Sequence, residues 1–233
     1  LGFGGADGVL VVCDATCLER NLNLVLQILE LHDHVLVCVN LMDEARRRGI
    51  QLNLAKLEEN LGVPVVGIVA RKKKTVGAVL EKLDRLMEQS GNAPSAFPYP
   101  SPVNEALSKL EPLFIPWPRL CRQSRWMGLR ALEDSTALTE LLKEHTEDRP
   151  LSSPEAETTM AEARGILQRA GISGAALRDL TVRTLVLEGE RIAQNCVICR
   201  KDKGYSERDR KLDRFLTGRR SAFPIMILLL LLL

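Results

Sequence analysis

Three short runs rich in β-branched residues constrain the fold more than any other feature of the sequence. They read GVLVV at residues 8–12, VLVCV at residues 35–39 and VPVVGIV at residues 63–69. Unbroken apolar runs of this kind are typical of strands that are buried on both faces, as in a parallel sheet covered by helices. The sequence therefore predicts a parallel sheet with three buried strands.

Helical patterns separate and follow these runs. Apolar residues recur at intervals of three and four within residues 22–29, 54–61 and 76–87, and Gly62 follows the second of these segments. This spacing predicts amphipathic helices, and a glycine is a common residue at a helix end. The β-α-β-α-β-α alternation predicts an α/β fold with part of a doubly wound parallel sheet, whose ligands bind at the carboxyl ends of the strands.

The composition changes after the third helical pattern. Residues 90–102 are rich in Ser, Gly, Asn and Pro, which is typical of a domain boundary. Beyond them the signals are helical, including a start at Ser153 and Pro154 with a stop at Gly171, although residues 182–187 fit either a helix or a strand. We expect one domain over residues 1–90 and an all-helical domain over residues 91–200.

The carboxyl-terminal section has the pattern of a membrane approach. Residues 201–220 carry eight basic and four acidic side chains, and residues 225–233 are all apolar. Basic residues flank membrane spans on the cytoplasmic side, but nine residues are too few for a span, which needs about 20. We expect a basic juxtamembrane segment at residues 201–222 and the start of a transmembrane helix at residues 223–233. A short anchor or a core strand is the alternative. Because the chain begins with Leu1, we expect a piece of a longer protein.

Composition excludes several functions. A net charge of +2, from 32 basic and 30 acidic residues, provides no general basic field for nucleic acid. Six scattered cysteines are too few for a disulfide framework and indicate a reducing environment. Cys196 and Cys199 have metal-site spacing, but without a second pair they are better explained as thiols than as zinc ligands. We expect no metal site in this chain.

Polar residues follow two of the predicted strands. Asn40 and Asp43 come after the second strand, and residues 70–74 come after the third. A carboxylate can accept two hydrogen bonds from the N1–H and 2-amino groups of guanine, which adenine does not offer, for about 1–3 kcal/mol of discrimination. Asn and Asp are also common caps and turn formers, so this pattern by itself leaves both interpretations open. Asp14 likewise fits either a functional role or a cap of the following helix.

Longer stretches make the interpretation specific. DATCLERNL at residues 14–22, NLMDEA at residues 40–45 and ARK at residues 70–72 resemble the G domain of the bacterial ferrous iron transport protein B family. RWMGLRALE at residues 125–133 resembles its helical domain, and DRKLDRFLT at residues 209–217 resembles the approach to its first membrane helix. The resemblance implies the carboxyl-terminal half of a G domain.

The resemblance also implies which residues contact a guanine nucleotide. Two motifs would do so, and Ala70 would offer its backbone N–H to the guanine carbonyl. Their residues are Asn40, Leu41, Met42 and Asp43 in the fourth G-protein motif, and Val69, Ala70 and Arg71 in the fifth. The family usually has Ser where Val69 stands, so we expect this loop to lack a hydroxyl that holds its turn and to bind more weakly.

The motifs for phosphate and metal are absent from the sequence. It contains no Gly-x-x-x-x-Gly-Lys-Ser/Thr and no Asp-x-x-Gly, which position phosphate and Mg²⁺ in GTPases. We therefore expect no catalytic residues and no GTPase activity in the isolated chain. GTP or GDP would be recognised here through its base alone, and Mg²⁺ would bind only in the intact protein.

These features predict the cytosolic, GTP-binding regulatory region of a ferrous iron uptake transporter. Fe²⁺ would be the ion transported by the intact protein, in the bacterial plasma membrane, with residues 1–220 on the cytoplasmic side. The alternative is a soluble or membrane-anchored GTPase, or a degenerate nucleotide-binding interaction module, unrelated to iron.

Overall fold

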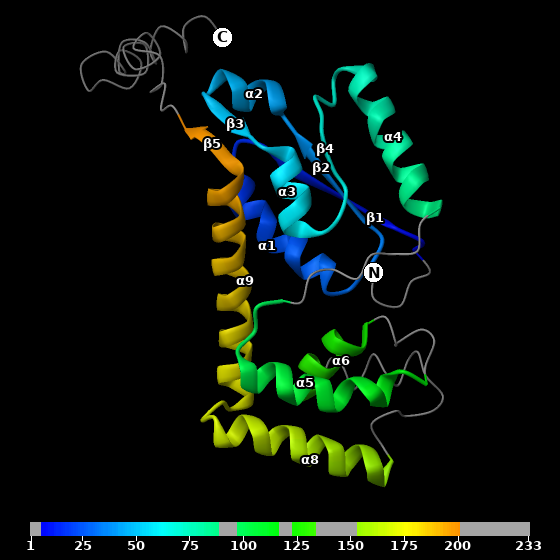
Figure 1. The fold of residues 1–233 in the computed structure, drawn as a ribbon, viewed down its shortest axis with the longest axis vertical. Helices are drawn as coiled ribbons and strands as arrows, with labels where there is room; N and C mark the ends of the chain where they lie inside the picture. The colour runs from blue at the N-terminus through cyan, green and yellow to red at the C-terminus, as the bar shows by residue number, and fades with distance from the viewer. Residues whose placement is uncertain (1–5, 89–96, 117–122, 134–152, 201–233) are drawn as a thin grey trace, which may run out of the picture.

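Three parallel strands form the sheet that the sequence predicts. The computed structural model describes residues 6–88, 97–116, 123–133 and 153–200 (Figure 1). In this part, β1 (Val9–Asp14), β2 (Val35–Asn40) and β4 (Val65–Gly67) lie in the order β1-β2-β4. Asp14 pairs with Asn40, so β1 and β2 end together at one edge. β4 is shorter than the apolar run at residues 63–69, and it begins directly after Pro64, which has no N–H to donate.

Helices cover both faces of this sheet. α1 (Leu18–Leu29) and α3 (Leu54–Leu61) pack on the face that carries Val11 and Val37. α4 (Lys73–Glu88) packs on the opposite face, over Leu36 and Val66. All three helices occur where the periodicity predicts them, and α3 is followed by Gly62 at a φ of 69°, a left-handed conformation that favours glycine. The α/β class with a parallel sheet is confirmed.

Two short elements interrupt the predicted alternation. α2 (Met42–Arg47) and β3 (Ile50–Leu52) lie between β2 and α3. β3 pairs antiparallel with β5 (Val197–Arg200), which follows the last described helix. Residues 197–200 therefore differ from the all-helical expectation. The reason is that such a short strand is stabilised by a partner far back in the sequence, so no local pattern indicates it.

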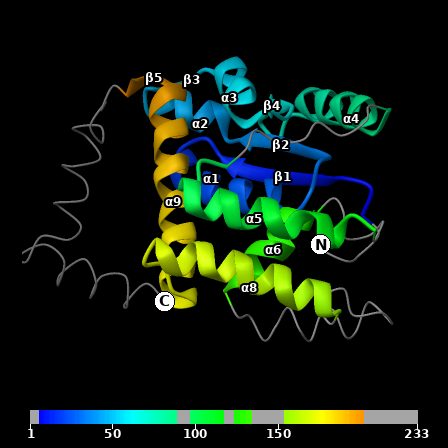
Figure 2. The same cartoon turned by 60° about the horizontal axis from the view of Figure 1, so that its bottom comes forward.

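The elements after residue 96 are otherwise helical. Figure 2 shows α5 and α8 side by side with α6 against them. α8 begins as predicted, since the Ser153 hydroxyl accepts a hydrogen bond from the Ala156 N–H at 3.1 Å and Pro154 occupies the first turn. Residues 182–187 are helical, within α9. The helices are α5 (Ser101–Phe114), α6 (Ser124–Leu132), α8 (Pro154–Arg169) and α9 (Gly174–Cys196).

α9 connects the helical part to the sheet. It runs from α8 up to β5 and packs against α1 and α3 on the way (Figure 1). The Asn53 N–H also donates to the Cys196 carbonyl at 2.8 Å, just before β3 and β5 pair. One continuous apolar core therefore extends from β1 to the end of α9.

β1 lies at an edge of the described sheet. Its inward side chains are buried, but Leu10 and Val12 on the other face are 44% and 56% exposed. α4 packs on the neighbouring strands β2 and β4 on this face. No described element covers this part of the sheet.

The predicted membrane approach cannot be compared with the structure. Residues 201–222 and 223–233 lie outside the described residues. Within the described ranges, none of the helices combines the length and the apolar character that crossing a membrane requires.

Candidate functional site

The carboxyl ends of β2 and β4 bring the two predicted motifs together. Asn40 is the last residue of β2, and its side-chain Oδ1 accepts a hydrogen bond from the Ala70 N–H at 3.1 Å. Backbone bonds join the same loops: the Ile68 N–H donates to the Val39 carbonyl at 2.8 Å, and the Met42 N–H donates to the Ile68 carbonyl at 3.2 Å. The two loops are thus held as one unit at the edge where parallel sheets bind ligands.

A tight turn carries the chain from Asn40 to Asp43. Leu41 has a φ of 61°, a left-handed conformation that is uncommon outside glycine. It lets the chain leave β2 and enter α2 within two residues, so Asp43 stands in the first turn of that helix. A carboxylate at this position is also favoured by the positive end of the helix dipole.

Asp43 lies among arginines. Its carboxylate accepts a hydrogen bond from Arg71, and Arg47 Nη2 lies 3.4 Å from its Oδ2. Burial works against ionisation of Asp43, but the bond and the charge of Arg71 outweigh it, so the pKa of Asp43 lies below its ordinary value. The site therefore presents an ionised carboxylate with 22% of its side chain exposed. The structure brings all seven predicted site residues to this one edge.

Thr75, in the first turn of α4, is a residue that sequence reasoning missed. Its Oγ1 accepts a hydrogen bond from the Val69 N–H at 3.2 Å and lies 2.8 Å from the Val69 carbonyl. The expectation that this loop lacks a hydroxyl to hold its turn is therefore wrong, since one reaches it from six residues along the chain. Threonine in a first helical turn often bonds nearby backbone, which was the available signal.

Asp14 holds a turn at the same edge. Its Oδ1 accepts hydrogen bonds from the Thr16 N–H at 2.7 Å and the Thr16 hydroxyl at 2.8 Å. Burial raises the pKa of Asp14, but these bonds outweigh it and leave the pKa below its ordinary value. The Ala15 N–H donates to the Asn40 carbonyl at 2.9 Å, so the turn supports the end of β2. Asp14 does not cap α1, because the N-cap residue of that helix is Cys17, and among the described residues no side-chain hydrogen bond caps its first turn.

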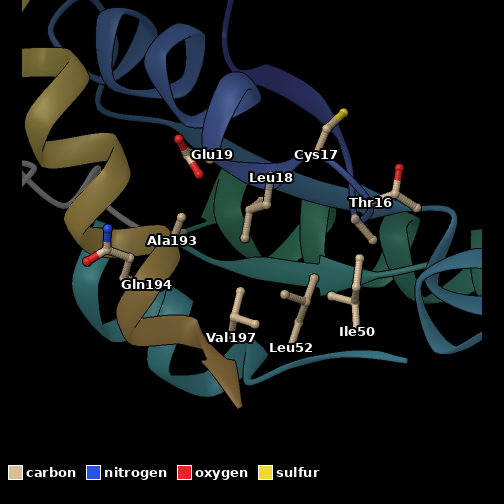
Figure 3. A pocket seen from close by; sticks show the side chains of 10 residues that line it. Thr16, Cys17, Leu18, Glu19, Ile50, Leu52, Ala193, Gln194 and Val197 are labelled. Carbon is tan, nitrogen blue, oxygen red and sulfur yellow. The ribbon is translucent and has the colours of Figure 1, made fainter. Parts of the chain in front are cut away.

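A separate pocket of about 310 Å³ lies between the turn after β1, strand β3 and the end of α9. Apolar side chains of Leu18, Ile50, Leu52 and Val197 converge on it, while the Cys17 sulfur points away from them (Figure 3). None of the seven predicted site residues lines it. This pocket is therefore distinct from the loops that hold Asn40 and Asp43.

Metal-binding clusters are not found in the described part of the chain. No group of three or more His, Cys, Asp or Glu residues there is arranged to hold an ion. Cys196 is a buried free thiol, and the side chain of Cys199 lies outside the described residues.

Comparison with known proteins finds a sequence match over the part of the chain that forms the parallel sheet. Residues 3–83 match the sequence profile of the family described as ferrous iron transport protein B. Over those residues the chain is similar to this family. The Fe(2+) transporter FeoB of Escherichia coli (strain K12) is 36% identical over 133 residues, which is 56% of this chain and 16% of that protein. The FeoB of Salmonella typhimurium is 31% identical over 137 residues, with the same coverage. The chain thus spans about one sixth of the length of these relatives.

Solved structures of FeoB proteins have the same fold. An S. thermophilus NFeoB mutant bound to GDP matches 82% of this chain and 70% of its own, at a TM-score of 0.66 and 26% identity. The cytosolic domain of T. maritima FeoB in a GMPPNP form matches 84% of this chain and 69% of its own, at a TM-score of 0.64 and 21% identity. The match extends across the helical elements as well as the sheet.

Proposed function

We propose that this chain reads the guanine base within the cytosolic GTP-binding region of a bacterial ferrous iron uptake transporter. The observation that carries the proposal is the hydrogen bond between Asn40 Oδ1 and the Ala70 N–H, which assembles the fourth and fifth motifs into one site. Residues 1–90 would form the partial G domain, and residues 91–200 the helical domain that responds to it. FeoB relatives solved with GDP and GMPPNP support the choice of ligand.

Base recognition follows from the chemistry of Asp43. Its ionised carboxylate would accept hydrogen bonds from the N1–H and 2-amino groups of guanine, whereas adenine has no such pair of donors. Arg71 occupies this carboxylate in the structure, but its side chain is 66% exposed, and an exposed ion pair is readily exchanged. The guanine carbonyl would share the Ala70 N–H, which now donates to Asn40.

Chemistry at the phosphates belongs to parts of the protein outside this chain. The sequence has neither the phosphate loop nor the Asp-x-x-Gly motif, so this chain would bind GTP and GDP through the base and would not hydrolyse GTP. Mg²⁺ would be held with the phosphates in the intact protein, and Fe²⁺ would be its transported ion.

A membrane location is part of the same proposal. The basic segment at residues 201–222 and the apolar residues 223–233 would lead into the first transmembrane helix, with residues 1–220 on the cytoplasmic side of the plasma membrane. The relatives named as Fe(2+) transporters support this arrangement. In cells that depend on the full-length protein, Asp43→Ala should lower the uptake of ferrous iron.

Guanine recognition can be measured directly on this chain. A titration of the ¹⁵N-labelled chain with GMP, followed by amide chemical shifts, detects binding even at millimolar affinity. We expect GMP to shift the amides of Asn40, Asp43 and Ala70 and to bind at least about tenfold more tightly than AMP. In Asp43→Ala, the preference for GMP should disappear.

The matched control is Asp84→Ala, which removes a carboxylate on α4, away from the strand ends. It should leave the preference for GMP unchanged. Equal shifts with GMP and AMP, or no shifts with either nucleotide, would rule out the proposed base recognition.

A further inference from the structure

Thr75 bridges the loop that carries Ala70. Its hydroxyl accepts a hydrogen bond from the Val69 N–H at 3.2 Å and can donate to the carbonyl of Val69 or Lys72, each 2.8 Å away. Backbone bonds tighten the same segment, because the Lys72 N–H donates to the Val69 carbonyl at 2.7 Å. One side chain thus contacts both polar backbone groups of the residue that precedes Ala70.

In the described part of the chain, Thr75 is the residue whose hydroxyl bonds the Val69 backbone. Val69 itself has an apolar, β-branched side chain that cannot bond the backbone. The Val69 carbonyl also accepts from the Lys72 N–H, but a half-buried Val69 N–H left without a partner is costly, so a loop with valine here needs an acceptor from elsewhere. The Thr75 hydroxyl can accept from the Val69 N–H and donate to the Val69 carbonyl at the same time, since a hydroxyl donates one hydrogen bond and accepts others.

We propose that Thr75 is the positioning residue of the loop that carries Ala70, and that its hydroxyl supplies the backbone hydrogen bonds that the Val69 side chain cannot make. It would do so by holding the Val69 backbone so that the Ala70 N–H stays aimed at Asn40 and at the guanine carbonyl. The inference rests on the proposed function, and it adds a residue that belongs to neither nucleotide-binding motif.

Three variants test this role with GMP as the probe. Thr75→Val removes the hydroxyl at nearly constant volume and should weaken GMP binding by about tenfold, while AMP binding stays the same. Thr75→Ser keeps the hydroxyl and should bind GMP within about twofold of the natural chain. The double variant Val69→Ser with Thr75→Val should regain most of the lost affinity, because serine restores a hydroxyl from the other side of the loop.

Hydrogen exchange provides a readout that needs no nucleotide. The Val69 and Ala70 amides should exchange about tenfold faster in Thr75→Val, and protection should return in the double variant. Far-UV circular dichroism confirms that each variant is folded. If Thr75→Val binds GMP as the natural chain does, or if Val69→Ser fails to rescue a folded Thr75→Val, the positioning role is wrong while base recognition stands. If the natural chain binds no GMP, base recognition and the role of Thr75 in it both fall.

Discussion

At the scale of single residues, a half-buried carboxylate links the sheet to the helical part. Glu30, at the end of α1, accepts a hydrogen bond from the hydroxyl of Tyr99, which precedes α5. Burial raises the pKa of Glu30, and the Tyr99 bond offsets this only in part. Burial and the neighbouring Glu30 also raise the pKa of Tyr99, so the tyrosine stays protonated and remains the donor.

This raised pKa predicts how stability changes with pH. The folded state holds the Glu30 proton more tightly than the unfolded state, so its contribution is complete below about pH 4.5 and is lost as the pH rises through the folded pKa. Glu30→Gln removes this titration and keeps an acceptor for Tyr99. The free energy of unfolding of the variant, relative to the natural chain, should rise with pH above about 4.5. Urea denaturation between pH 4 and 8 measures it, and a difference that is flat or falls with pH would contradict the assignment.

At the scale of elements, the contact between α1 and α9 depends on a glycine. A Cβ atom on Gly189 of α9 would lie 2.8 Å from the Oδ1 of Asn23 and 3.5 Å from the Cβ of Leu22. The first distance is too short for ordinary contact, and Asn23 Oδ1 is itself buried with no described partner. A side chain at position 189 would therefore require the buried Asn23 Oδ1 to move.

Gly189→Ala should consequently destabilise the protein although alanine is the better helix former. We expect a loss of about 1–3 kcal/mol from the displacement of the Asn23 side chain, whose Oδ1 is buried. The control is Gly165→Ala on α8, where the nearest atom would be Arg169 Nη1 at 3.9 Å. This substitution should stabilise by about 0.5–1 kcal/mol. Thermal unfolding measures the stability of both variants. An equal gain in stability in both would show that the contact between α1 and α9 has room for a methyl group at position 189.

At the scale of the whole molecule, the sheet and the helical part share one core. It contains buried residues of β1 and α1 together with residues of α5, α8 and α9, without a break between them. α9 contributes to both parts, and the pairing of β3 with β5 joins its far end to the sheet. Such a core predicts that the described elements unfold together, since neither part keeps its buried surface alone.

The positions of the tryptophans allow a direct test. Both tryptophans, Trp117 and Trp126, follow residue 96, whereas Leu22 lies on α1 with 0% exposure. Leu22→Ala should cost about 2–5 kcal/mol and lower the urea midpoint equally by tryptophan fluorescence and by far-UV circular dichroism. Leu24→Ala, at a position 55% exposed on the same helix, should change stability by less than about 0.5 kcal/mol. An unshifted fluorescence midpoint in Leu22→Ala would mean that the two parts unfold separately.

Local chemistry explains which features were predictable. The apolar runs of the three parallel strands, the glycine after α3 and the Ser153 cap of α8 each depend on residues adjacent in sequence. The Asn40 and Asp43 pair could also be predicted, because the four residues of this motif are adjacent in the sequence. β3, β5 and the short helix α2 carry too few residues for a periodic signal, and β3 and β5 need each other as partners.

The sequence by itself therefore determined the parallel sheet and its covering helices, since backbone propensity and burial act over a few neighbouring residues. The seven candidate guanine contacts were predicted from the resemblance of contiguous motifs. Only the tertiary structure decided how those contacts are held. It joined Asn40 to Ala70 across two loops and paired Asp43 with Arg71. It also placed the Thr75 hydroxyl within hydrogen-bond distance of the Val69 N–H. These relations depend on distances between residues on different elements, which are set when the helices and strands pack together.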